Sequence, residues 1–139
     1  MISTDEIVKF LKELSGSEEI NESSDIFEDV GMVGDDFHEM IEKFSTHFSV
    51  DMTEYIWYFH TDEEGLNFGG LFFKPPYGLV DRIPITPSML KDFANKGKWD
   101  IAYPIHKIPS KRPDLFINKI LVVASAAVII IMLIRKYFI

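Results

Sequence analysis

The chain has 139 residues, a formal net charge of −8 at pH 7 and no cysteine. This length leaves room for one soluble domain and little besides. The lack of cysteine excludes a disulfide scaffold, thiolate catalysis and zinc bound through sulfur. The hydrophobic fraction of 47% excludes a fully disordered chain.

Acidic side chains are concentrated in the first half of the chain. Residues 1–64 carry 18 acidic and 3 basic side chains, whereas residues 65–139 carry 4 acidic and 11 basic ones. An acidic surface repels the phosphates of nucleic acids, so we expect no nucleic-acid binding. Two roles remain open for it: a solvated face that keeps the domain soluble, or a docking face for a partner protein with a basic surface.

The N-terminal segment has the apolar spacing of a helix, with one apolar face. Ser3, Thr4 or Asp5 can cap the start of this helix, and Gly16 ends it. An acidic, loop-like segment follows over residues 17–34. The apolar face of the helix consists of Ile7, Phe10, Leu11 and Leu14, and the candidate core anchors of the loop are Ile26, Phe27 and Val30.

A second helix is predicted directly after this loop, because apolar residues recur there at alternating three- and four-residue steps. Asp35 or Asp36 lies at its start, where a carboxylate can cap the helix, and Asp36 with Glu39 has the spacing of a capping box. The apolar stripe consists of Phe37, Met40, Ile41, Phe44 and Phe48, and the opposite, acidic face carries Asp35, Asp36, Glu39 and Glu42.

Further elements are predicted between this helix and residue 104. An aromatic-rich helix is expected over residues 53–59, followed by a break at 65–70 and by a short strand or packed loop at 71–73. Another helix begins at the cap Thr86 and ends at Gly97. The residues expected in the core here are Tyr55, Trp57, Tyr58, Phe59, Leu90, Phe93, Ala94, Trp99, Ile101 and Tyr103.

The C-terminal segment is strongly apolar and predicts a transmembrane helix. Residues 120–134 contain no charge, and a helix of this length spans about 22 Å. Neighbouring apolar residues lengthen the stretch to residues 116–136, which approaches the ~20 residues that a bilayer requires. Lys119, Arg135 and Lys136 can extend their ammonium and guanidinium groups to the two interfaces.

The charges that flank this helix predict its orientation. Four basic residues precede it and two follow it, which favours an N-terminal side in the cytoplasm. The first ten residues have neither a basic nor an apolar region of the kind that a signal peptide has. We therefore expect a tail-anchored chain with a helical domain at 1–104, a basic linker at 105–115, an anchor at 116–136 and a short tail at 137–139. The flanking basic residues are Lys107, Lys111, Arg112 and Lys119 before the helix, and Arg135 and Lys136 after it.

Residues 24–52 resemble an acyl carrier protein. In that family a first helix and a long acidic loop lead to a turn of the type D-L-G-x-D-S-L, which opens an acidic second helix. Asp29-Val30-Gly31 matches the D-L-G, and Asp35-Asp36-Phe37 falls, after one extra residue, where D-S-L would be. The resemblance implies a small, mainly α carrier-like bundle. Asp36 occupies the position of the serine that carries phosphopantetheine, and a carboxylate lacks the hydroxyl nucleophile which that modification needs.

The chain is also similar to a family of small uncharacterised proteins from enteric bacteria. The shared features are the turn Gly34-Asp35-Asp36 and a later segment, residues 83–90, that leads to residues 97–100. This resemblance covers most of residues 1–104. It implies a carrier-like fold without an established activity and, together with the anchor, a location in the bacterial inner membrane.

The polar residues form no pattern typical of catalysis or metal binding. His38, His47 and His60 are scattered without metal-ligand spacing, and adjacent carboxylates at an exposed helix start are expected to be ionised. We therefore expect no catalytic residue, no metal and no cofactor. The predicted function is a non-enzymatic, membrane-tethered interaction module, whose partners are the bilayer and a protein with a basic surface. The predicted partner-binding residues are Asp35, Asp36, Glu39 and Glu42.

Two other functions remain open from the sequence. The chain could be a carrier in acyl or lipid metabolism that is modified at another hydroxyl, and the candidate serines are Ser23, Ser24 and Ser45. It could also be a small regulatory subunit that packs its anchor against an integral membrane protein. Small residues in the anchor allow such close helix packing, and they are Ala124, Ser125, Ala126 and Ala127.

Overall fold

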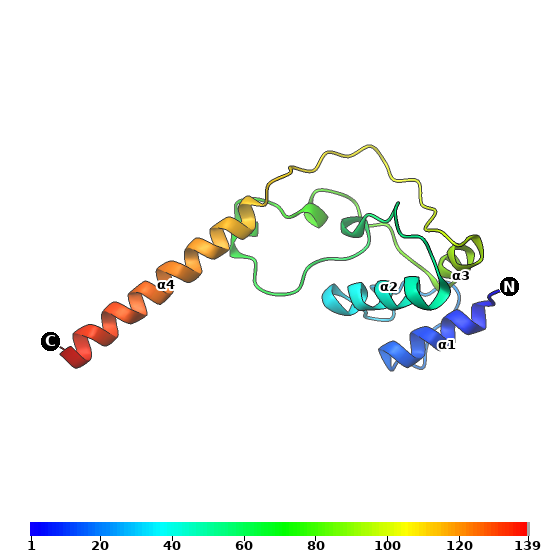
Figure 1. Cartoon of the computed structure of the whole chain (residues 1–139), viewed down its shortest axis with the longest axis horizontal. Helices are drawn as coiled ribbons and strands as arrows, with labels where there is room; N and C mark the ends of the chain where they lie inside the picture. The colour runs from blue at the N-terminus through cyan, green and yellow to red at the C-terminus, as the bar shows by residue number, and fades with distance from the viewer. Residues whose placement is uncertain (139) are drawn as a thin grey trace. The chain divides into compact units, whose positions relative to one another are not determined.

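The computed structural model describes residues 1–138 and is mainly helical, as expected (Figure 1). Among these residues there is no strand, and the single isolated bridge joins Asp51 and Lys98. Three short 3₁₀ turns lie between the second and third helices. In chain order the elements are α1 (Thr4–Ser15), α2 (Gly34–Phe48), η1 (Trp57–Phe59), η2 (Phe68–Leu71), η3 (Pro76–Gly78), α3 (Pro87–Lys96) and α4 (Pro113–Phe138).

The chain divides into two compact units that differ strongly in charge. Unit 1 consists of Met1–Glu64 and Val80–His106, and unit 2 consists of Gly65–Leu79 and the chain from Lys107 onward. Unit 1 carries 21 acidic and 7 basic side chains, a net charge of −14, whereas unit 2 carries 1 acidic and 7 basic ones, a net charge of +6. Unit 1 ends two residues beyond the expected boundary at 104. Residues 65–79, expected in the helical domain, group with α4 instead.

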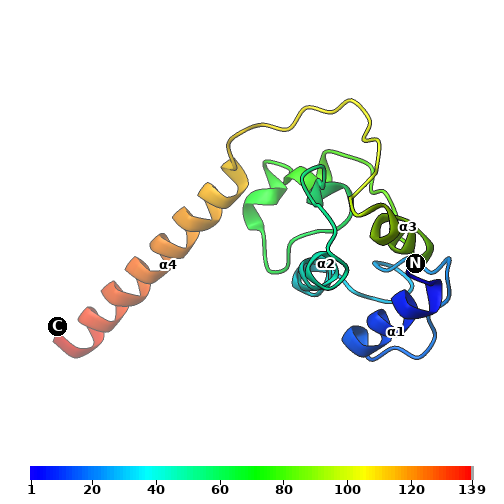
Figure 2. The ribbon, with the colours of Figure 1, turned by 45° about the vertical axis from the view of Figure 1, so that its right-hand side comes forward.

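Helix α1 has the predicted bounds, and Ser3 is the cap among the three candidates. The Ser3 side chain accepts a hydrogen bond from the Glu6 backbone N–H at 3.2 Å, and the Glu6 carboxylate accepts one from the Ser3 N–H at 2.7 Å. Gly16 ends the helix with a φ of +69°, a conformation that glycine adopts without steric cost. Ile7 and Leu11 are fully buried, and α1 packs against α3 in unit 1 (Figure 2).

Helix α2 buries the predicted stripe, but its start is capped differently from the prediction. Phe37, Met40 and Phe44 lie in the core. The N-cap residue is Val33, so neither Asp35 nor Asp36 occupies the capping position, and the predicted capping box is wrong. The Asp62 side chain, distant in sequence, accepts a hydrogen bond from the Gly34 N–H at 3.0 Å and takes over the capping role.

The predicted helix over 53–59 is wrong, because the structure has only the 3₁₀ turn η1 there. The Asp51 side chain accepts a hydrogen bond from the Thr53 N–H at 2.9 Å, and the Tyr103 hydroxyl accepts one from the Ile56 N–H at 3.2 Å. The Ile56 N–H, which in a helix would donate to the Met52 carbonyl, is therefore used by Tyr103, whereas the Thr53 N–H lacks an intrahelical acceptor at a helix start in any case. Phe59 is buried as expected, and the neighbouring aromatic side chains are partly buried.

Helix α3 matches its prediction at both ends. The Thr86 hydroxyl accepts a hydrogen bond from the Met89 N–H at 3.3 Å, Pro87 occupies the first turn, and Gly97 ends the helix with a φ of +70°. Trp99 follows and is 1% exposed. Leu90 and the residues around it complete the core that α1 and α2 begin.

The two segments of unit 1 are joined by specific contacts between the acidic loop and the chain before α3. The Arg82 guanidinium donates two hydrogen bonds to the Asp25 carboxylate, at 3.1 and 2.7 Å, and pairs with Glu28 at 2.8 Å. The Ile26 N–H donates to the Ile85 carbonyl at 2.9 Å. These contacts hold the loop against the core, with Ile26 and Ile85 buried.

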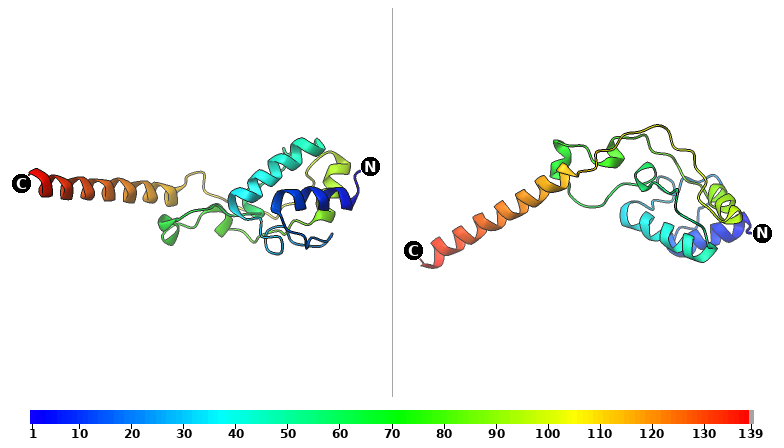
Figure 3. Two further views of the ribbon diagram at one scale, coloured as in Figure 1. Left: turned by 90° about the horizontal axis from the view of Figure 1, so that it is seen from below. Right: turned by 45° about the horizontal axis from the view of Figure 1, so that its top comes forward.

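Helix α4 is continuous over 26 residues (Figure 3). It is long and apolar enough to cross a membrane, with a mean hydropathy of 2.6, and none of its most apolar stretch is buried in the protein. It begins three residues before the predicted anchor. Residues 71–73, expected as a strand or packed loop, form the end of η2 and the turn after it, and their side chains are exposed.

Candidate functional site

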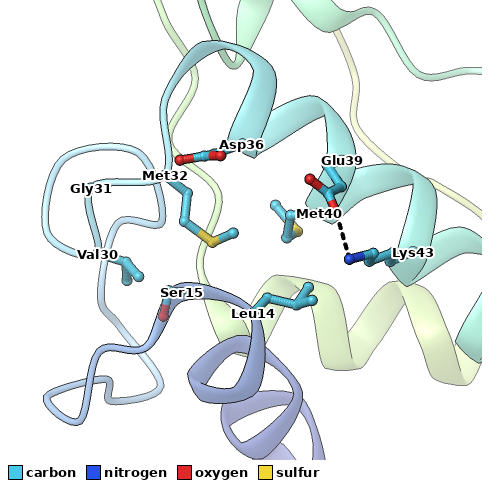
Figure 4. A pocket seen from close by; sticks show the side chains of 9 residues that line it. All are labelled: Leu14, Ser15, Val30, Gly31, Met32, Asp36, Glu39, Met40 and Lys43. Carbon is cyan, nitrogen blue, oxygen red and sulfur yellow. Dashed lines mark ion pairs between the residues drawn. The ribbon is translucent and has the colours of Figure 1, made fainter.

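Unit 1 has a groove between α1, the acidic loop and α2, and Figure 4 shows the residues that line the smaller of its two cavities. Two adjoining cavities of about 130 and 610 Å³ form it, and they share Leu14, Glu39 and Lys43. We call this surface the α1–α2 groove. Its lining residues are Phe10, Glu13, Leu14, Ser15, Val30, Gly31, Met32, Asp36, Glu39, Met40, Glu42, Lys43, Thr46 and His47.

The helical repeat explains why acidic and apolar side chains meet in this groove. Asp36, Glu39 and Lys43 are three and four residues apart on α2, so they follow one ridge of the helix. This ridge lies beside the buried stripe of α2. Met40 belongs to the buried stripe and also lines the groove. Leu14 contributes the facing apolar side chain from α1. The result is an apolar floor with a charged rim.

The floor of the smaller cavity is rich in flexible apolar side chains. Met32 and Met40 direct their side chains toward the space between α2 and Leu14 (Figure 4). Unbranched thioether side chains adjust easily to ligands of different shape. At the other end of the groove, the rings of Phe10 and His47 are 5.7 Å apart. Met40 is fully buried and Met32 is 6% exposed, so both belong mainly to the core. The half-buried Phe10 and Leu14 are the apolar side chains that a partner can reach.

The rim of the groove is negatively charged. Glu39 forms an ion pair with Lys43, and both side chains are about half exposed. An exposed pair of this kind contributes less than about 1 kcal/mol to folding. Four carboxylates and one ammonium group line the groove, which leaves a net charge of −3. Within residues 1–138, Asp36 and Glu42 form no ion pair and remain exposed to solvent.

The structure brings together three of the four predicted partner-binding residues. Asp36, Glu39 and Glu42 line the groove, whereas Asp35 is exposed but lies outside the lining. Sequence reasoning missed Glu13, which reaches the groove from α1. No local signal marks Glu13, because only the packing of α1 beside α2 places it there.

A second polar cluster lies in the core of unit 1, around His60. Its Nδ1 is 2.9 Å from the Ile83 carbonyl, and its Nε2 is 2.7 Å from the Tyr103 hydroxyl. A carbonyl only accepts, so Nδ1 carries the proton and Nε2 accepts from Tyr103. The Tyr103 oxygen in turn accepts from the Ile56 N–H at 3.2 Å and from Trp99 Nε1–H at 2.9 Å.

The environment of His60 favours its neutral form. Burial lowers the pKa of His60 to about 4, against a smaller opposing effect of the Ile83 carbonyl, and the charge of Arg82 lowers it further. The ring stacks on Tyr55 at 5.6 Å and meets Trp99 edge-on at 5.4 Å. Aromatic rings enclose this histidine, so we interpret the cluster as part of the core and not as a binding site.

The serines of the carrier hypothesis occupy different environments. Ser24 is buried, and its hydroxyl accepts a hydrogen bond from the Asn21 N–H at 3.0 Å. Ser45 is half-buried and donates to the Glu42 carbonyl at 2.9 Å, whereas Ser23 is exposed. In the described part of the chain, no group of three or more His, Asp or Glu side chains could hold a metal ion.

Comparison with known protein families identifies the region that holds the groove. A family model described as "Protein of unknown function (DUF1493)" matches residues 2–101. The chain belongs to this family. The DUF1493 match includes every residue of the α1–α2 groove and ends before α4 begins. No curated protein and no solved structure matches the chain.

Proposed function

We propose that this DUF1493 protein is a membrane-tethered, non-enzymatic interaction module, which binds a basic segment of a partner protein in the α1–α2 groove. The observation that carries the proposal is the composition of the groove, in which the half-buried Phe10 and Leu14 lie beside a rim of net charge −3. Lysine or arginine side chains of a partner complement the rim, and apolar side chains beside them fill the floor.

The tether in this proposal is α4. At 1.5 Å per residue, its 26 residues are about 39 Å long, which exceeds the ~30 Å hydrocarbon core of a bilayer. The excess of basic residues before the helix favours a single pass through a bacterial inner membrane. In this orientation unit 1 and the start of α4 lie on the cytoplasmic side. A tether raises the effective concentration of the groove near membrane partners, so modest affinity is sufficient.

We further propose that α1, the acidic loop and α2 form an acyl-carrier-like arrangement without the carrier's prosthetic group. In support, Asp36 lies in the first turn of α2 with its carboxylate exposed, at the position matched to the modified serine. Of the alternative serines, Ser24 is buried and hydrogen-bonded. In this proposal the acidic second helix serves protein recognition alone.

The test is affinity capture of the full chain from its native membrane in mild detergent. The triple charge reversal Asp36→Lys, Glu39→Lys and Glu42→Lys changes the groove. We expect loss of the captured partner, because the rim then repels a basic segment. Sequencing the captured protein shows whether it has a segment rich in lysine and arginine.

The matched control reverses three acidic residues that do not line the groove and do not lie on α2: Glu19→Lys, Glu22→Lys and Glu54→Lys. This control has the same net charge as the groove variant, so it separates a specific site from general electrostatics. Equal loss in both variants would contradict a specific groove. If both triple variants still captured the partner, the contact would lie in unit 2. The small residues 124–127 of α4 would then be altered next.

A further inference from the structure

Unit 2 contains a buried charge at the start of α4. Asp114 is 1% exposed, and its carboxylate accepts hydrogen bonds from Arg112 at 2.9 and 2.6 Å. It also accepts one from the Asn67 side-chain amide at 3.0 Å. The Asn67 side-chain oxygen in turn accepts from the Asn118 amide at 2.9 Å. Together these residues tie the segment 65–79 to the first turns of α4.

Gly69 allows this contact to be close. Its N–H donates to the Asn118 side-chain oxygen at 2.8 Å, and a Cβ placed on Gly69 would lie 1.9 Å from the Asp114 carbonyl oxygen. Only glycine fits such an approach of two backbones. The position of residues 65–79 relative to the start of α4 is therefore fixed. We call residues 65–79 the lobe.

The lobe exposes large apolar side chains. Leu66 is 83% exposed, Leu71 is 81% exposed and Phe72 is 73% exposed, and Phe68 and Phe73 are also exposed. The lobe has no acidic residue and one basic residue, Lys74. So many large apolar side chains exposed within one short segment are costly in water and mark a segment that a partner or a membrane covers.

A cavity of about 270 Å³ lies in unit 2 beside these side chains. Its apolar lining includes Phe72, Leu79 and Ile108, and its basic lining includes Lys74 and Lys111. Both lysines are exposed, and neither forms an ion pair within the described residues. The Asp114 carboxylate also borders the cavity, but Arg112 and Asn67 already occupy it.

The point at which the lobe is attached to α4 determines its depth in the bilayer. Residues 116–136 of α4 are about 32 Å long, enough to cover the ~30 Å hydrocarbon core. Asp114 and Asn118, to which the lobe is tied, then lie at the outer edge of this core. The lobe is held at the depth of the lipid headgroups, where aromatic side chains and lysines are both favoured.

We propose that the lobe is an interfacial anchor which inserts its phenylalanines at headgroup depth, and that its cavity binds an anionic phospholipid. The acyl chain contacts Phe72, Leu79 and Ile108, and the phosphate contacts Lys74 and Lys111. This inference rests on the membrane tether of the proposed function. The bilayer is the occupant because Asn67 and Gly69 tie the lobe to the first turns of the apolar helix α4, and because unit 2 carries a net charge of +6.

The depth of the lobe can be measured because the chain has no cysteine. Single-cysteine variants of the full chain are labelled with a nitroxide and reconstituted into vesicles of phosphatidylcholine and phosphatidylglycerol. Oxygen concentrates in the bilayer and a nickel chelate stays in water, so their relaxation effects report the depth of the label. Leu71→Cys tests the lobe, Val128→Cys tests the middle of α4, and Glu54→Cys is the aqueous reference.

We expect the label at position 71 to be more accessible to oxygen than that at 54, and less than that at 128. A label at 71 as accessible to the nickel chelate as that at 54, with 128 inaccessible to it, would overturn the lobe insertion and leave the tether intact. If the label at 128 were also accessible to the chelate, the tether itself would fail.

The lipid site is tested in the same vesicles. Adding phosphatidylglycerol to pure phosphatidylcholine should move the label at position 71 deeper, because the lysines then have anionic partners. The double substitution Lys74→Gln and Lys111→Gln should abolish this shift, while Lys96→Gln and Lys98→Gln in unit 1 should preserve it. A change in depth that persists in the Lys74→Gln, Lys111→Gln variant would overturn the lipid site. So would a change in depth that free phosphate in solution suppresses in the Lys96→Gln, Lys98→Gln variant, because the lysines would then bind phosphate and not lipid.

Discussion

At the scale of single residues, His60 shows how the core of unit 1 determines a protonation state. Its Nε2 accepts a hydrogen bond from a Tyr103 hydroxyl that already accepts two others, from Ile56 and Trp99. A second ring proton would therefore have no acceptor at that position. Burial acts in the same direction, and the pKa of His60 falls to about 4.

This lowered pKa predicts that unit 1 loses stability in mild acid. Between pH 6.5 and about 4 the unfolded chain binds a proton at position 60 that the folded chain does not bind. The contribution of His60 to the free energy of unfolding is fully present above pH 6.5 and falls as the pH is lowered. At pH 4 the free energy of unfolding is lower by about 3 kcal/mol. Denaturation of the full chain in detergent, followed by tryptophan fluorescence at several pH values, measures the loss.

Nuclear magnetic resonance supplies the direct check on that prediction. The His60 imidazole should remain neutral, with the proton on Nδ1, down to about pH 4. Protonation of His60 at the pH of an ordinary histidine would show that the buried network does not hold in solution.

Gly69 is a residue whose role follows only from a backbone contact. In Gly69→Ala the new Cβ would lie 1.9 Å from the Asp114 carbonyl oxygen, so the lobe must move away from α4. We expect a nitroxide at position 71 to become more mobile and to lose its fixed depth. Gly78→Ala is the matched control, since its Cβ meets the nearest atoms at 3.6 to 3.8 Å, an ordinary contact. Equal mobility in both variants would contradict the close packing of the lobe.

At the scale of elements, helix ends that depend on local residues follow the sequence well. Ser3 with Glu6 caps α1, Thr86 caps α3, and Gly16 and Gly97 end these helices, and each of these caps bonds to a residue three or four positions away. Buried stripes are equally local, and those of α1, α2 and α3 were all predicted. Sequence reasoning succeeds here because the partners of each backbone group lie within one helical turn.

Elements that depend on distant residues were predicted poorly. The start of α2 is capped by Asp62 from 28 residues away, and the Ile56 N–H in the segment 53–59 donates to the Tyr103 hydroxyl from 47 residues away. The groove shows the same limit. Its acidic residues on α2 were predicted, but Glu13 joins them only through helix packing. No spacing rule along the chain detects such contacts.

The cap of α2 gives a prediction at this scale. Asp62→Ala removes the acceptor of the Gly34 N–H, which should destabilise unit 1 by about 1 kcal/mol. Asp36→Ala removes no cap and should cost less, through the helix dipole alone. Chemical denaturation of the full chain in detergent compares the two. A larger cost for Asp36→Ala would restore the capping box suggested by the sequence.

At the scale of the whole molecule, the charge division coincides with the division into units. Unit 1 carries a net charge of −14 and contains the groove, whereas unit 2 carries +6 and contains α4 and the lobe. An anionic bilayer attracts the second and repels the first. In the proposed function, this difference in charge disfavours contact of the acidic groove with lipid and favours its binding to a basic partner.

The most direct test of the proposed function is photo-crosslinking from inside the groove in living cells. A photoreactive amino acid replaces Thr46, which is exposed and lines the groove, or Glu54, which lies outside it. We expect position 46 to crosslink to a lysine- and arginine-rich segment of one membrane or peripheral protein, and the charge-reversed groove to lose this product. Equal crosslinking from position 54, or a product that persists after charge reversal, would contradict the α1–α2 groove as the docking site.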